Sequence, residues 1–173
     1  MNAVKIAMWS GPRNISTALM RSFENRSDTF ITDEPFYAHY LQQTGFEHPM
    51  REEIIKSGNP NWNEVAEYLT GAIPNGKSVW YQKHMVQHCL PGADLGWTEK
   101  LANCFLIRNP MEVILSYSEK YEITSIYQLG YPQQVLLFNH LKNKNEVNVI
   151  VLDSKDILQN RKNLLQLLCK ELD

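Results

Sequence analysis

The sequence of 173 residues lacks the features that mark several large classes of protein. It has no apolar run of the roughly 20 residues that a membrane-spanning helix needs, and its first residues do not form the basic and apolar segments of a signal peptide. With 17 basic and 19 acidic residues, it also lacks the charge excess typical of nucleic-acid or membrane-surface binding. Repeats and low-complexity segments are absent as well. We therefore expect a single domain over residues 1–173, with neither nucleic acid nor membrane as a partner.

Cysteine is scarce too, and the three that occur, Cys89, Cys104 and Cys169, lie far apart. Neither these residues nor the five histidines show the spacing of a zinc site, so we expect no bound metal. An odd number of dispersed cysteines favours reduced, buried thiols. The sequence therefore predicts a cytoplasmic protein.

What the sequence does contain is an alternation of short apolar runs and amphipathic stretches. The runs predict strands at 4–9, 29–32, 78–82, 104–107 and 147–152. The amphipathic stretches predict helices at 16–25, 36–43, 62–69 and 131–142, one that begins at Asn109–Pro110, and a last one that Ser154 caps. Residues 44–61 are expected to be a loop, and 85–100 are ambiguous. This alternation is typical of an α/β fold, with a parallel central sheet flanked by helices on both faces.

The turn between the first strand and the first helix is a candidate anion site. It contains Gly11 and Pro12, and the helical pattern begins at Ser16. The first N–H groups of a helix are unpaired and its dipole attracts negative charge, so a helix N-terminus can bind an anion. Arg13 lies inside the turn, and a guanidinium can bind phosphate or sulfate through two hydrogen bonds. The alternative is an ordinary strand-to-helix turn with a solvated arginine.

This turn does not match the loop of proteins that hydrolyse ATP or GTP. Counted from Gly11, the Walker A spacing would place Ser16 at the second glycine and Thr17 at the lysine. Ile15 stands where a glycine could be expected. Because a β-branched residue resists positive φ, we expect the turn to use ordinary backbone angles.

Ionisable residues follow four of the predicted strands. Arg13 follows the first strand, Glu34 the second, Lys83 and His84 the third, and Arg108 the fourth. Ligands of parallel sheets bind outside the carboxyl ends of the strands, which all meet at one edge. A charged residue after a single strand is normally just solvated. Together, three cations and one carboxylate at one edge predict a site that binds a polyanion beside a general base.

Two segments resemble the signatures of the P-loop sulfotransferases, which use 3′-phosphoadenosine 5′-phosphosulfate (PAPS) as the sulfuryl donor. Residues 12–17, Pro-Arg-Asn-Ile-Ser-Thr, are similar to the loop that binds the donor's 5′-phosphosulfate in that family. Residues 107–117 are similar to its Arg-Asn/Asp-Pro…Ser-Tyr segment, in which an arginine and a serine eight residues later bind the 3′-phosphate. Residues 8–19, followed by Asp-Glu-Pro-Phe-Tyr at 33–37, resemble more closely a bacterial and plant branch of the family. The resemblance covers nearly the whole chain and implies the three-layer, P-loop nucleotide-transferase-like fold of sulfotransferases.

The resemblance also implies roles for individual residues. Arg13 would hold the phosphosulfate, Lys83 would offset charge on the bridging oxygen, and Glu34 would take the acceptor's proton. His84 is the competing base, because another branch of the family uses a histidine after its third strand. The product would be adenosine 3′,5′-bisphosphate, and the acceptor a small molecule with a hydroxyl or amine. The implied donor-binding residues are Gly11, Pro12, Arg13, Asn14, Ile15, Ser16, Thr17, Arg108 and Ser116.

Several of these residues also have a purely structural interpretation. Glu34 could cap the helix that follows it, and Lys83 could be an exposed strand end or pair with Glu34. His84 could be a histidine at the sheet edge with no role in proton transfer. Arg108 could be the partner of an ion pair, and Ser116 could bond to its own helix.

Two departures from the family pattern keep other functions open. The family usually has glycine at the position of Ile15, and it carries a basic C-terminal segment over the donor that we expect this domain to lack. One alternative is a small-molecule kinase or other nucleotide transferase on the same fold. Another is a catalytically silent nucleotide-binding domain. Apolar surface exposed at the end of the chain could also produce a homodimer.

Overall fold

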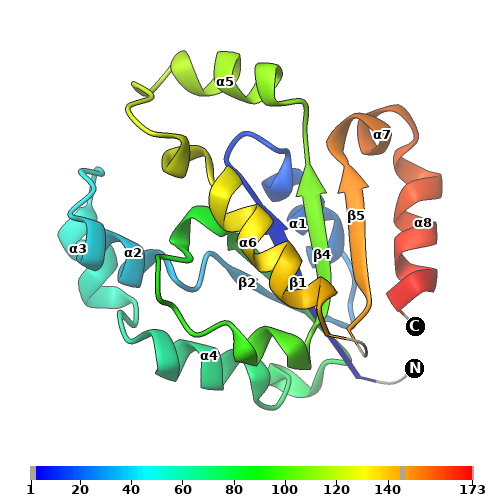
Figure 1. The fold of residues 1–173 in the computed structure, drawn as a ribbon. Helices are drawn as coiled ribbons and strands as arrows, with labels where there is room; N and C mark the ends of the chain where they lie inside the picture. Colours follow the sequence, from blue (N-terminus) through cyan, green and yellow to red (C-terminus); the bar gives the residue numbers. More distant parts are fainter. Residues whose placement is uncertain (1–2, 145–146, 173) are drawn as a thin grey trace.

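The computed structural model describes residues 3–144 and 147–172, and the five predicted strands form one parallel sheet in it (Figure 1). The order across the sheet is β2-β3-β1-β4-β5. The strands are β1 (Val4–Ser10), β2 (Thr29–Asp33), β3 (Val79–Met85), β4 (Ala102–Ile107) and β5 (Val149–Asp153). All four strand pairings are parallel, so the predicted parallel α/β fold is confirmed. The predicted domain covers residues 1–173, of which 1–2, 145–146 and 173 lie outside the described residues.

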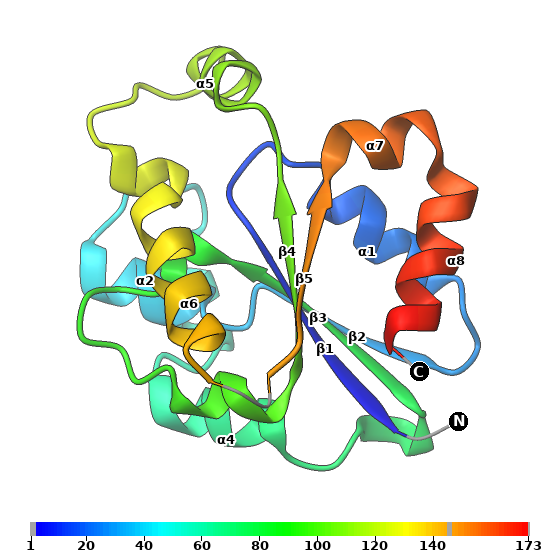
Figure 2. The same cartoon turned by 45° about the vertical axis from the view of Figure 1, so that its right-hand side comes forward.

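Helices cover both faces of the sheet, which gives three layers (Figure 2). The α-helices are α1 (Ser16–Glu24), α2 (Tyr37–Thr44), α3 (Arg51–Ser57), α4 (Trp62–Thr70), α5 (Pro110–Ser118), α6 (Tyr131–Lys142), α7 (Ser154–Gln159) and α8 (Arg161–Leu172). The 3₁₀ helices are η1 (Pro74–Gly76), η2 (Val86–His88), η3 (Gly96–Lys100) and η4 (Ile126–Leu129). Helices α1, α7 and α8 pack on one face, and α4, η3 and α6 pack on the other.

Successive side chains of β1 explain why the strand is apolar throughout. Ile6 and Met8 point into the core beneath α1 and α8, whereas Ala7 and Trp9 point into the core beneath α4 and α6. Each of these four side chains is buried. A parallel strand covered on both faces has no polar face, and such strands form continuous apolar runs that are easily recognised in a sequence.

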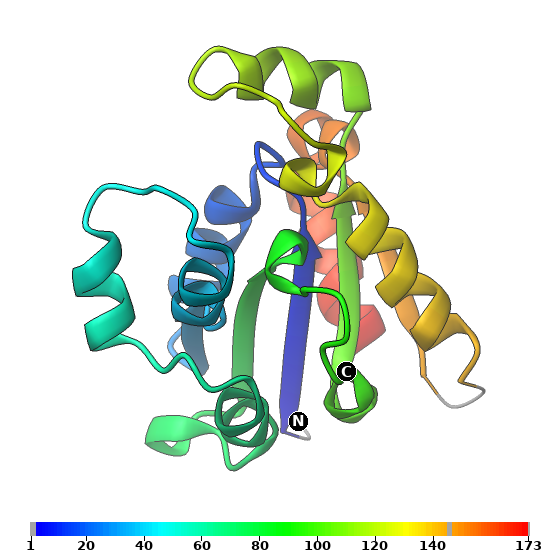
Figure 3. The same cartoon turned by 60° about the vertical axis from the view of Figure 1, so that its left-hand side comes forward.

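Helix α5 lies apart from these layers. Figures 1 and 3 show it beyond the carboxyl end of β4, above the turn that follows β1. Val113 and Tyr117 hold it in place by packing against Leu129 of η4. This position brings α5 next to the predicted anion-binding turn. Among the described residues, no helix has the length and apolar character that a membrane span requires.

Three secondary-structure predictions were wrong. Helix α3 lies inside the predicted loop 44–61, and none of its residues is buried, so it leaves no apolar periodicity in the sequence. Strand β3 continues to Met85 rather than ending at residue 82. The predicted last helix is two helices, α7 and α8, and the side chain of Asp153 rather than that of Ser154 caps the first of them.

Candidate functional site

The β1–α1 turn has an unusual backbone. Arg13 and Ile15 adopt φ angles of 63° and 55°, in the left-handed region. The prediction of ordinary angles at Ile15 was therefore wrong, although a β-branched residue disfavours this conformation by roughly 1–2 kcal/mol. The side chain of Ile15 packs against the core beneath α1 and α8, and this burial offsets the strain. Strain of this kind often occurs at functional sites.

Two contacts hold this turn against its neighbours. The Asn14 side chain is buried and its Nδ2 donates to the carbonyl oxygen of Leu106 at the end of β4, at 3.1 Å. A Cβ at Gly11 would lie 2.7 Å from the carbonyl oxygen of Leu129, so only glycine fits there without movement of the backbone. The turn is therefore fixed from two sides, by β4 and by η4.

The two arginines of the predicted anion site are in direct contact. Arg108 Nη1 donates to the carbonyl oxygen of Arg13 at 2.8 Å, and Arg13 Nε donates to Ser116 Oγ at 2.9 Å. Arg108 Nε also donates to Glu112 Oε2 at 2.9 Å, so the alternative interpretation of Arg108 as an ion-pair partner is true as well. Residues that follow β1 and β4 therefore converge on one place.

A hollow of about 310 Å³ lies at this place. Within the described chain, no side chain caps α1 and its first turn holds no acidic residue, so its N-terminal N–H groups face the hollow without a competing carboxylate. Two guanidinium groups, hydroxyls and helix N–H groups form a donor set that fits a phosphate or sulfate ester. Gly11 and Pro12 belong to the same turn but do not line the hollow, whose lining is Arg13, Asn14, Ile15, Ser16, Thr17, Arg108 and Ser116.

Lys83 of β3 is buried and paired with two carboxylates at the end of β2. Its Nζ lies 2.7 Å from Asp33 Oδ1 and 2.5 Å from Glu34 Oε1, and its side chain is only 3% exposed. The pairing of Lys83 with Glu34 was one of the interpretations left open by the sequence, whereas an exposed strand end is excluded. Asp33 was not predicted, although parallel pairing of β2 with β3 places it directly opposite Lys83.

Glu34 is held by the backbone as well. Its φ angle of 47° is left-handed, and its N–H donates to the carbonyl oxygen of Lys83 at 2.9 Å. Its own carbonyl oxygen accepts from the N–H of Tyr37 at the start of α2. The chain therefore turns sharply at Glu34, and the carboxylate remains at the edge of the sheet.

His84 does not lie at the edge of the sheet, contrary to the prediction. Because β3 includes residues 83 and 84, their side chains point to opposite faces. His84 is 1% exposed and stacks on Trp9, with ring centroids 4.2 Å apart. Burial, with smaller contributions from His88 and Lys83, lowers the pKa of His84 to about 3. A neutral histidine inside the aromatic core is not placed to share the surroundings of Glu34.

His88 is the histidine that does lie beside Glu34. Its Nε2 is 4.0 Å from Glu34 Oε2, and its ring stacks on Tyr37 with centroids 5.2 Å apart. Burial, and then Lys83, lowers the pKa of His88 to about 3, so its imidazole is neutral and can donate or accept a hydrogen bond. Sequence reasoning missed it because it lies within residues 85–100, where no pattern showed the end of β3.

A family model described as "Sulfotransferase domain" matches residues 4–173. The chain belongs to the sulfotransferase domain family. The prediction of a transferase enzyme is thereby confirmed at the level of the family.

Two curated proteins of Arabidopsis thaliana are similar to this sulfotransferase domain, "Branched-chain-amino-acid aminotransferase-like protein 1" and "Branched-chain-amino-acid aminotransferase-like protein 2". They are 32% and 29% identical to it over 171 and 168 residues, which is 97% of this chain in each case. The chain spans 30% of the length of each.

Solved structures of sulfotransferases have the same fold. The sulfotransferase domain from the curacin biosynthetic pathway superposes with a TM-score of 0.60 at 14% identity, over 98% of this chain and 73% of that one. The domain from the Synechococcus PCC 7002 olefin synthase gives 0.58 at 13% identity, over 99% and 74%. Mouse sulfotransferase SULT7A1, solved in complex with PAP, gives 0.51 at 14% identity, over 96% and 57%. At such identities the likeness shows the fold alone, and it confirms the predicted sulfotransferase architecture.

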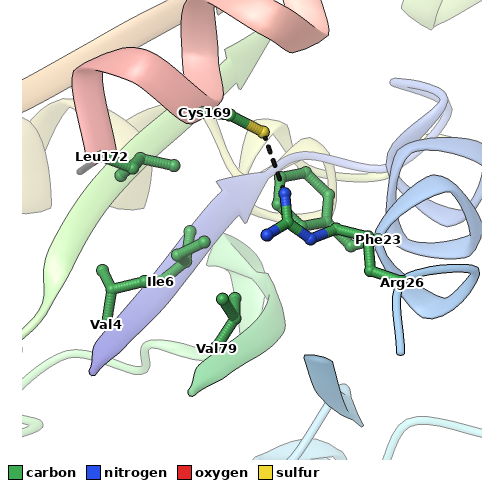
Figure 4. Close-up of a pocket in the computed structure, with 7 residues that line it drawn as sticks. All are labelled: Val4, Ile6, Phe23, Arg26, Val79, Cys169 and Leu172. Carbon is green, nitrogen blue, oxygen red and sulfur yellow. Dashed lines mark hydrogen bonds between the residues drawn. The ribbon is translucent and has the colours of Figure 1, made fainter. Parts of the chain in front are cut away.

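A smaller hollow of the sulfotransferase domain lies away from all predicted site residues. It measures about 140 Å³ and is lined by the beginning of β1 together with α1 and α8 (Figure 4). Arg26 Nη1 donates to Cys169 Sγ at 3.3 Å, while its other nitrogens bind both carboxylate oxygens of Asp28. Because it lies toward the amino ends of the strands, this hollow is at the edge opposite to the one where parallel sheets bind their ligands.

Proposed function

We propose that this domain transfers a sulfuryl group from PAPS to a hydroxyl or amine of a small acceptor. The observation that carries the proposal is the contact between Arg13 and Arg108, with Ser116 beside them, at the uncapped start of α1. Two guanidiniums from separate strand ends can share one doubly phosphorylated nucleotide. The mouse neighbour described as complexed with PAP supports this choice of donor.

The two parts of the hollow would bind the two ends of the donor. Arg13, the hydroxyls of Ser16 and Thr17, and the helix N–H groups would hold the 5′-phosphosulfate. Arg108 and Ser116 would hold the 3′-phosphate. Ile15, which replaces the family's glycine, still adopts the left-handed conformation that a glycine would adopt without strain.

The residues at the ends of β2 and β3 would carry the transfer itself. Lys83 would offset the charge that develops on the oxygen bridging sulfur and phosphorus, and a preorganised donor of this kind contributes roughly 2.7–4 kcal/mol. Glu34 would take the proton of the acceptor. His88, whose Nε2 lies 4.0 Å from the free oxygen of Glu34, would help to orient that carboxylate.

Binding of adenosine 3′,5′-bisphosphate tests the proposal directly. At about 100 times its dissociation constant, the ligand adds about 2.7 kcal/mol of stability, which should raise the melting temperature by roughly 5–10 °C. Arg13→Ala and Arg108→Ala should abolish the increase. Arg21→Ala, which removes an exposed arginine of α1, is the matched control and should retain it.

The opposite outcomes would favour the other functions. A response to ATP with magnesium, but none to the bisphosphate, would contradict the proposal and favour a kinase. Binding of the bisphosphate without PAPS-dependent turnover would favour a silent nucleotide-binding domain. We also retain, as parts of the proposal, a cytoplasmic location and a homodimeric assembly.

A further inference from the structure

The hollow beside Glu34 is a candidate acceptor site. It measures about 460 Å³ and lies between the β2–α2 junction and α3. Pro35, Ala38 and Ile54 give it an apolar wall, and Asp33 and Glu34 line its edge. Its volume is in the range of small-molecule sites. A ligand in this hollow would lie next to the group proposed to take its proton.

The charge of this hollow is negative. Of the described residues that line it, two are carboxylates and none is lysine, arginine or histidine. Lys83 binds both carboxylates, but one ammonium cannot neutralise two of them. The lysine side chain is 3% exposed and that of Asp33 is 49% exposed, so the ammonium is buried whereas Asp33 remains accessible.

Two titratable side chains beside Glu34, Tyr37 and His88, add no positive charge. Burial, and then Glu34, raises the pKa of Tyr37 to about 12, so its hydroxyl stays neutral. His88 is neutral as well, because burial lowers its pKa to about 3. The negative charge of the two carboxylates is therefore not balanced by Tyr37 or His88.

The arginines on the adjoining helices already have partners. Arg21 of α1 is bonded to Glu24 at 2.5 Å. Arg51, at the start of α3, is bonded to Glu52. Asp33 is only the smallest of the influences that raise the pKa of Arg21, and neither arginine is bonded to it, so a ligand with a positive group could pair with this carboxylate.

We propose that this hollow binds a small amino alcohol, with its ammonium group beside Asp33 and its hydroxyl beside Glu34. The inference rests on the sulfuryl transfer proposed above. In that step the acceptor oxygen forms a bond to sulfur while the bond from sulfur to the bridging oxygen breaks. The bonding electron pair stays with the departing bisphosphate, and the hydroxyl proton moves to Glu34. An acceptor with a negative group would be repelled by both carboxylates.

Three compounds of similar size test this inference by binding alone. Aminopentanol, hexanol and hydroxypentanoate are titrated into the full chain without nucleotide, and dissociation constants are measured by saturation-transfer NMR. Aminopentanol should bind at least about fivefold more tightly than hexanol, and hydroxypentanoate should bind most weakly. Asp33→Asn should bring the ratio of aminopentanol to hexanol close to one. Glu67→Gln makes the same charge change on the exposed face of α4 and should leave that ratio unchanged.

A second variant keeps the test independent of any folding defect in Asp33→Asn. Ser57 is exposed at the rim of the hollow, so Ser57→Lys should fold and should reverse the preference toward hydroxypentanoate. The inference is overturned if no compound binds, if hydroxypentanoate binds the wild-type chain as tightly as aminopentanol, or if Asp33→Asn keeps the ratio. Aminopentanol selectivity without a thermal response to the bisphosphate would retain the amine site and remove the sulfuryl-transfer role. A thermal response to the bisphosphate without selectivity for aminopentanol would retain the sulfuryl-transfer role and remove the amine site.

Discussion

At the scale of single residues, the site is organised by ion pairs within the chain. Lys83 is bound by two carboxylates, and Arg108 is bound by Glu112. Each pair holds a cation in place, but each carboxylate also competes with an incoming anion. Such ion pairs fix the positions of Lys83 and Arg108, but they lower the affinity of the site for an anionic ligand.

Substitution of Glu112 measures how much its carboxylate lowers the affinity for an anion. Glu112→Gln keeps a hydrogen-bond acceptor for Arg108 Nε but removes a negative charge beside the proposed 3′-phosphate position. We expect the affinity for adenosine 3′,5′-bisphosphate to rise up to about fivefold, measured by calorimetric titration. Glu24→Gln, which removes the equivalent partner of Arg21 on α1, should leave the affinity unchanged. Weaker binding in Glu112→Gln would contradict a competing role for this carboxylate.

At the scale of elements, the β1–α1 turn and helix α5 form one unit. The turn is fixed by β4 through Asn14 and contacts α5 through Arg13 and Ser116. On its other side, Gly11 lies against η4, and η4 also packs against α5. A change in any of these elements should therefore alter the shape of the hollow that Arg13 and Arg108 line.

Gly11→Ala tests this coupling. The new Cβ would be 2.7 Å from the carbonyl oxygen of Leu129, so the turn or η4 must move. We expect a loss of about 1–3 kcal/mol in the free energy of unfolding, measured by urea titration, together with weaker bisphosphate binding. Gly96→Ala is the control, because its Cβ would meet only the flexible carboxylate of Asp94. Loss of stability with unchanged binding would show that the turn and the hollow are independent.

The elements also show what the sequence could and could not predict. Strands buried on both faces and the two arginine segments were recognisable because their patterns are local. Helix α3 was missed because it buries none of its residues, and the left-handed angle at Ile15 was missed because packing overrides local preference. His88 was missed because its position depends on where β3 ends. Contacts such as Lys83 with Asp33 depend on strand register, which the sequence does not state.

At the scale of the whole molecule, buried histidines link stability to pH. The pKa values of His84 and His88 are lowered to about 3, mainly by burial. Between pH 6.5 and 3 the unfolded chain therefore binds protons that the folded protein does not, and acidification favours unfolding.

The free energy of unfolding should thus fall as the pH is lowered through this range. Each histidine contributes up to about 1.4 kcal/mol per pH unit below 6.5. Urea titrations at a series of pH values measure the slope, and His88→Gln should reduce it by about half. A stability that does not change between pH 6.5 and 5 would contradict the burial of these two imidazoles.

The strand order separates the two halves of the proposed chemistry across the sheet. The arginines that would bind the donor follow β1 and β4, whereas Glu34, Lys83 and the acceptor hollow belong to β2, β3 and the helices after β2. Under this proposal, substitutions in α2 and α3 can alter which acceptor is used while the donor-binding residues after β1 and β4 stay the same. In such an arrangement new acceptor preferences can evolve by substitutions on one side of the central strand.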